Sequence, residues 1–223
     1  MRIRLKVVAA AVVAVAAGLT AVGCSGDDPP AGSTTSPATP SSAVALSMTF
    51  DEANRKLPMD GTKDLPITWE VSGAQDTDLV LAARRSLAFI YWEQASTVWA
   101  PIIPLGRYFY TEEHYQKLLA PYANAIETNP LAGRLWVKYM GAEKTGPDET
   151  TVTFCDDIGF LRSAEQPSPP ARQQRWNLES YRMKKVMTGD GESHWLADGL
   201  IDNDGKREAK YGAQCAAWAK HKP

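Results

Sequence analysis

Two stretches of the chain repeat apolar residues at helical spacing. Between residues 79 and 99 apolar positions recur every three or four residues after a polar Asp-Thr-Asp start, which predicts an amphipathic helix that ends before Pro101. A second helix is expected after Thr111, because this residue caps a first turn that carries two glutamates. Its apolar side reaches Ile126, and Pro121 is expected to kink or divide it.

The second half of the chain alternates apolar and polar residues instead. Strands are expected over 134–142, 150–158, 176–188 and 193–201, with turns at Thr145–Asp148 and Gly189–Gly191. Residues 206–220 are compatible with a last helix, and residues 48–75 form an irregular lead-in in which 67–71 alternate like a short edge strand. The order predicts an α+β fold, with N-terminal helices packed on a curved antiparallel sheet of four or more strands.

The N-terminus has the organisation of an export signal. Residues 1–23 begin with three basic side chains and continue as an uncharged, alanine-rich apolar run that ends at Cys24. The Ala-Val-Gly-Cys sequence at 21–24 resembles the lipobox of bacterial lipoproteins, which implies diacylglycerol on Cys24, cleavage before it and a place on the extracytoplasmic face of the bacterial cell membrane. An ordinary secretory signal is the alternative. Residues 24–47 are rich in serine, threonine and proline and are expected to form a disordered tether.

Charge narrows the range of partners. Residues 24–223 carry 21 basic and 26 acidic side chains, so no global attraction to nucleic acid is expected. The basic residues between Arg172 and Lys185 are interpreted as a solvated face of the sheet. No nucleotide-binding or nucleophile motif is present, and we expect no cofactor.

Two cysteines remain once Cys24 is assigned to lipid. An even pair in an exported domain usually forms a disulfide, so Cys155 and Cys215 are predicted to join the C-terminal segment to a strand. A redox pair would be expected to show C-x-x-C spacing, which these cysteines lack. The three histidines, His114, His194 and His221, lack metal-ligand spacing, and no metal site is expected.

Three segments carry a resemblance to a known family. They are Phe89–Trp92 on the long helix, Thr151–Asp157 on a strand and Val186–Leu196 in the last hairpin. With them the chain resembles actinobacterial secreted lipoproteins that contain an NTF2-like (SnoaL-like) domain, here over 76–223. The resemblance implies a cone-shaped sheet wrapped around a helix with a pocket between them. The superfamily includes isomerases, hydratases and non-catalytic binding domains, so the fold alone assigns no activity.

Aromatic residues are the first candidates for lining such a pocket, although they also suit an ordinary core. They are Tyr91, Trp92, Trp99, Trp136, Tyr139, Phe154, Tyr181 and Trp195. Asp156, Asp157 and His194 are candidate catalytic residues, because a pocket aspartate can act as a general base. Neighbours on a strand face opposite sides, so at most one aspartate faces the pocket. The alternative is that they are surface carboxylates at a strand end or partners of Arg162.

The sequence therefore predicts a lipid-anchored, non-catalytic domain that binds a small apolar ligand or another envelope protein. Two alternatives remain. One is an enzyme of the isomerase or dehydratase type with a pocket aspartate as its base. The other is an assembly domain with a filled core.

Overall fold

The structure is a computed structural model that describes residues 47–166, 175–201 and 205–221. The expectations for residues 1–46, including Cys24, the signal and most of the tether, lie outside the described residues, as does Arg172. Among the described residues, no helix has the length and apolar character that a membrane span needs.

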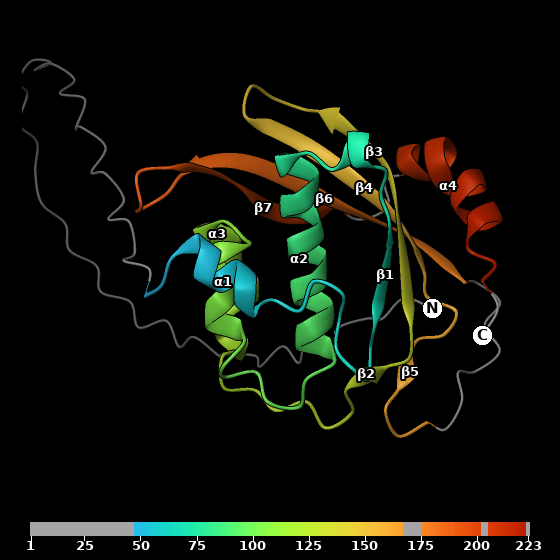
Figure 1. Cartoon of the computed structure of the whole chain (residues 1–223), viewed down its shortest axis with the longest axis horizontal. Coiled ribbons are helices and arrows are strands. Elements are labelled where there is room, and N and C mark those ends of the chain that lie inside the picture. The colour runs from blue at the N-terminus through green and yellow to red at the C-terminus, as the bar shows by residue number, and fades with distance from the viewer. Residues whose placement is uncertain (1–46, 167–174, 202–204, 222–223) are drawn as a thin grey trace, which may run out of the picture. The chain divides into compact units, whose positions relative to one another are not determined.

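A five-stranded sheet forms the centre of the fold (Figure 1). Its strands, in spatial order, are β1 (Ile67–Glu70), β3 (Leu135–Lys144), β4 (Glu149–Asp157), β6 (Trp176–Met187) and β7 (Ser193–Ile201). Neighbours pair antiparallel except β1, which runs parallel to β3 at the edge. The four strands expected in the second half are confirmed, and so is the edge strand at residue 67. Two short strands, β2 (Leu131–Ala132) and β5 (Arg162–Ser163), pair separately.

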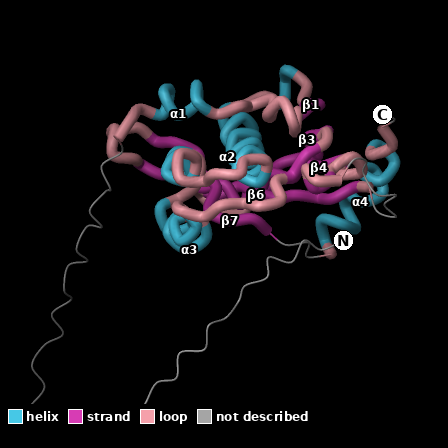
Figure 2. The backbone as a smooth tube through the Cα atoms, turned by 90° about the horizontal axis from the view of Figure 1, so that it is seen from below, coloured by secondary structure: helices cyan, strands magenta, loops and turns pink. Residues whose placement is uncertain are grey.

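Helices cover both faces of this sheet. They are α1 (Phe50–Lys56), α2 (Asp78–Gln94), α3 (Glu112–Leu118) and α4 (Lys206–Trp218). Figure 2 shows α1 and α2 on the same side of the strands. On the opposite face, α4 packs against Cys155 and Leu178. The expected α+β class is confirmed.

The long helix α2 ends at Gln94, so its expected extension to Trp99 is wrong. The segment after the helix pairs with a loop instead. Val98 forms a β-bridge with Ile126, and the backbone N–H of Trp99 donates to the carbonyl of Ala125. Apolar spacing continued past the helix end, but it could not reveal this competing tertiary pairing.

The second helix is divided as expected. Helix α3 ends at Leu118, and Pro121 lies in a separate 3-10 turn, Ala120–Tyr122. Ile126 is beyond both and is 73% exposed, so its expected place on the helix's apolar side is wrong. The lead-in is less irregular than expected, since Thr49 and Glu52 form a capping box that begins α1.

The disulfide between Cys155 and Cys215 is confirmed. It joins β4 to α4 across 60 residues of sequence. The main core lies on the other face of β4, between the sheet and α2, and its largest fully buried side chains are those of Phe89, Tyr110, Phe154 and Tyr181. Each of these four is 0% exposed, so side chains fill the space between helix and sheet.

Candidate functional site

Asp156 and Glu179 form a carboxyl pair on the face of the sheet that α2 covers. Asp156 lies opposite Asn177 in the register of β4 and β6, and Phe154 lies opposite Glu179, so the two acids are diagonal neighbours on one face. Asp156 is 0% exposed, whereas Glu179 is partly buried. The sequence reasoning missed Glu179, because strand alternation alone does not show which acid of β6 comes to lie beside Asp156.

Two phenols donate to this pair. The hydroxyl of Tyr91, on α2, donates to Glu179 Oε2 at 3.4 Å, and the hydroxyl of Tyr181 donates to Glu179 Oε1. Burial raises the pKa of both tyrosines well above the ordinary value, and the charge of Glu179 adds to the effect. Both phenols therefore keep their protons and stay donors.

Asp156 has no such donors, since neither of its oxygens accepts a hydrogen bond from a described residue. Burial raises its pKa well above the ordinary value, and the neighbouring charge of Glu179 raises it further. Burial also raises the pKa of Glu179, but the hydrogen bonds from Tyr181 and Tyr91 partly offset that rise. Burial therefore favours the protonated form of both acids, and the hydrogen bonds from the two phenols favour the charged form of Glu179 only.

Glu93 is a third buried acid, at the C-terminal end of α2. It is 8% exposed, and burial together with the charge of Glu127 raises its pKa to about 7. The C-terminal end of a helix dipole also disfavours the charged form of an acid. Glu93 thus changes charge near neutral pH.

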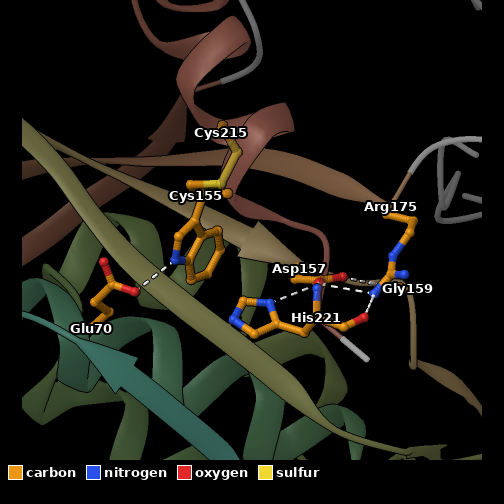
Figure 3. Close-up of polar contacts among 8 residues, drawn as sticks. Glu70, Cys155, Asp157, Gly159, Arg175, Cys215 and His221 are labelled. Atoms are coloured by element: carbon orange, nitrogen blue, oxygen red, sulfur yellow. Dashed lines mark hydrogen bonds and ion pairs between the residues drawn. A yellow bond between two sulfur atoms is a disulfide. The ribbon is translucent and has the colours of Figure 1, made fainter. Parts of the chain in front are cut away.

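Asp157, the neighbour of Asp156 on β4, lies on the opposite face of the sheet, where it contacts Arg175, Gly159 and His221 (Figure 3). Its carboxylate accepts from Arg175 Nη2 at 3.1 Å and from the backbone N–H groups of His221 and Gly159 at 3.2 and 3.0 Å. The His221 ring lies 3.0 Å from the same carboxylate and stacks on Trp136 with ring centroids 4.7 Å apart. Asp157 therefore fixes the end of the chain after α4.

The expectation of surface aspartates is wrong, because both Asp156 and Asp157 are 0% exposed. The partner of Asp157 is Arg175, and Arg162 bonds to backbone carbonyls. The prediction that neighbouring aspartates face opposite sides agrees with their contacts. The third candidate, His194, is in neither cluster, since it stacks on Phe50 and lies 2.8 Å from Asp190 in the β6–β7 turn.

Asp190, Glu192 and His194 bring three metal-ligand atoms within 4.8 Å of one another. Both acids are exposed. Hydrogen bonds from Thr188 and from the backbone N–H of Glu192 hold the pKa of Asp190 down to about 2. The hairpin turn accounts for this arrangement, since these bonds close the turn around Gly191, whose φ is 83°.

The eight aromatic candidates do not line one cavity. Tyr91, Phe154 and Tyr181 meet in the core beside the carboxyl pair, and Tyr139 lies next to Phe154. Trp92 contacts Phe89, and Trp99 contacts Tyr122 in the loop after α2. Trp136 is on the α4 face, as its stacking on His221 shows. Trp195 lines a separate hollow on the surface.

That hollow, which we name the helix hollow, has a volume of about 300 Å³ and lies between α1, α2 and the β6–β7 hairpin. Its walls include Phe50, Asn54, Arg85, Tyr108, His194 and Trp195. Within the described part of the chain, Arg85 has no hydrogen-bonded or ion-paired partner, although Asp51 and Asp78 line the same hollow. The helix hollow thus combines aromatic side chains with two cations, Arg85 and Lys185, and two carboxylates, Asp51 and Asp78. The carboxyl pair does not line it.

Comparisons with protein-family models, with curated proteins and with solved structures found no match to this chain.

The buried acids predict a stability that decreases as pH rises. The pKa of Glu93 is about 7 when folded, above the value of about 4.3 for an unfolded glutamate, so its stabilising contribution is present below the unfolded value and is lost as pH rises through the folded one. Between about pH 4.5 and 8, Glu93→Gln should abolish a loss on the order of 3 kcal/mol in the free energy of unfolding. Asp156→Asn should further reduce the dependence of the free energy of unfolding on pH.

Urea denaturation across this pH range provides the measurement. Glu113→Gln, at an exposed position of α3, is the matched control and should retain the parent's slope. If the free energy of unfolding of Glu93→Gln changed with pH as steeply as that of the parent, the raised pKa of Glu93 would be contradicted.

Proposed function

We propose that this chain is an extracytoplasmic lipoprotein of a bacterial cell membrane, held there by diacylglycerol on Cys24, and that its folded part is a non-catalytic ligand-binding domain. The disulfide between Cys155 and Cys215 supports export, because such bonds form and persist in oxidising compartments. The position of Cys24 directly after an apolar segment supports the anchor. Helices followed by a largely antiparallel sheet are consistent with the NTF2-like form that we propose for the domain.

The helix hollow is the binding site in this proposal. The observation that carries it is the contrast between a core of fully buried aromatic side chains and a hollow that places Trp195 and Tyr108 near the guanidinium of Arg85. Aromatic rings bind apolar groups, and a guanidinium without a bonded carboxylate favours an acidic group. The expected ligand is a small molecule with an apolar body and an acidic edge.

A dye with these two features tests the site. We expect 8-anilinonaphthalene-1-sulfonate to bind the protein, with its rings on the aromatic wall and its sulfonate near Arg85. Asn54→Trp should fill the opening from α1 and weaken dye binding about tenfold or more, since a lost apolar contact of moderate size is worth about 1.4 kcal/mol.

Asn54→Ala is the matched control, because it changes the same position without filling the hollow, and it should bind the dye as the parent does. Fluorescence titration and the thermal midpoint are measured together. Equal affinity in the parent and in a folded Asn54→Trp variant would exclude the helix hollow as the dye site and favour recognition of an envelope protein.

The lipid anchor has an independent test. The chain is expressed in a bacterium that is fed with alkyne-tagged palmitate. We expect the parent protein to carry the label and to be found in the membrane fraction. Cys24→Ala should lose the label, because only the Cys24 thiol can take the diacylglycerol. Cys155→Ala is the control, and its label should be retained. A label that persists in Cys24→Ala would disprove the anchor.

A second function, catalysis of the isomerase or dehydratase type, is favoured by one observation. Asp156 is fully buried, has no hydrogen-bond donor among the described residues and lies beside Glu179 and two phenols, which suits proton transfer. Such a base has to reach its substrate. Catalysis therefore predicts that a carbodiimide with glycine ethyl ester modifies Asp156 in the folded protein.

The binding proposal predicts the opposite result. Mass spectrometry should find exposed Glu113 modified and Asp156 protected until the protein is unfolded. Modification of Asp156 in the folded protein at a rate similar to that of Glu113 would favour the enzyme.

A further inference from the structure

A second hollow, of about 450 Å³, lies where the segment after α1 meets the β2–β5 pair. We name it the cationic hollow. Its walls include Lys63, Asp64, Pro66, Arg134, Phe160 and Arg162. Three cations and one anion are an unusual set in a chain whose net charge is −2. A concentration of positive charge in a hollow points to an anionic occupant.

Backbone contacts hold these walls together. Ala132 of β2 pairs with Arg162 of β5, and the N–H of Gly133 donates to the carbonyl of Asp64 at 2.9 Å. At Gly133, φ is 121°, and a Cβ there would lie 2.0 Å from the carbonyl oxygen of Phe160. Only glycine allows the backbone at residue 133 to come this close to the Phe160 carbonyl. This close contact brings Arg134 and Phe160 to the wall of the same hollow.

Arg162 is oriented before any ligand arrives. Its Nη1 donates to the carbonyl of Gln166 at 2.7 Å and, at 3.4 Å each, to the carbonyls of Ser163 and Ala164. These bonds hold one nitrogen of the guanidinium and leave its positive charge without a counter-ion. In the described ranges, neither Lys63, Arg134 nor Arg162 is ion-paired with a carboxylate.

The chemistry of the walls selects the occupant. Guanidinium groups match the geometry of phosphate oxygens, and a lysine adds a point charge. Asp64 reduces the charge of the wall to that of two cations, which suits a single phosphate dianion better than an extended polyanion. The Phe160 ring and Pro66 offer apolar surface to carbon atoms next to that phosphate.

We propose that the cationic hollow is a binding site for a phosphate group, supplied either by a soluble phosphate compound or by a phospholipid headgroup. This site is distinct from the helix hollow and does not depend on the ligand assigned there.

Calorimetric titration of the full chain with inorganic phosphate tests the soluble source. Arg134→Gln should weaken binding about tenfold or more, because it removes a charge-assisted contact. Arg134 is exposed, so this variant should fold. Arg162→Gln should have an effect of the same size. Arg55→Gln removes one exposed arginine outside the hollow and should bind phosphate as the parent does.

Vesicles test the headgroup source. The full chain with Cys24→Ala is mixed with vesicles of phosphatidylcholine alone or with added phosphatidylglycerol, and the bound fraction is measured by flotation. A gain on the phosphatidylglycerol vesicles that Arg134→Gln abolishes and Arg55→Gln retains supports the headgroup. Phosphate binding in solution with no such gain supports a soluble ligand. If neither probe distinguishes Arg134→Gln from Arg55→Gln, the proposal is overturned.

Discussion

The burial of β4 on both faces is the constraint on which the rest of this structure depends. Because β4 is the central strand, with α2 over one face and α4 on the other, every residue from Thr150 to Asp157 is buried. The strand ends in two aspartates, so alternation sends one carboxyl into each layer. Burying a carboxyl group lowers the stability of the fold unless the group is hydrogen-bonded, ion-paired or neutral. Each of the two aspartates therefore needs its own compensation for burial.

The burial of Asp156 and that of Asp157 are compensated in different ways. On the α4 face, Asp157 is paired with Arg175 and bonded to the backbone of His221, and these contacts hold the C-terminal segment near the disulfide. On the α2 face no cation contacts Asp156 among the described residues, and burial raises the pKa of its carboxyl, which favours the neutral form. The first arrangement stabilises the fold, whereas the second leaves it sensitive to pH.

Because side chains fill the interior, the candidate ligand-binding sites lie at the surface. The space between α2 and the sheet is occupied by aromatic rings, while each of the two hollows is lined by segments from distant parts of the sequence. Their chemistry differs, since one combines several aromatic rings with two cations and two carboxylates, and the other combines one aromatic ring with three cations and one carboxylate. Both proposed ligands therefore bind at surface hollows and not in the core.

The sequence by itself determined the α+β class, the four long strands, the division at Pro121 and the Cys155–Cys215 pair, because alternation, proline and cysteine act through local geometry or simple counting. It also determined that Asp156 and Asp157 face opposite sides. Only the tertiary structure decided that both are buried, that Glu179 joins Asp156, and that α2 stops at Gln94. These outcomes depend on contacts between residues far apart in the chain, and the period of a sequence pattern carries no information about such partners.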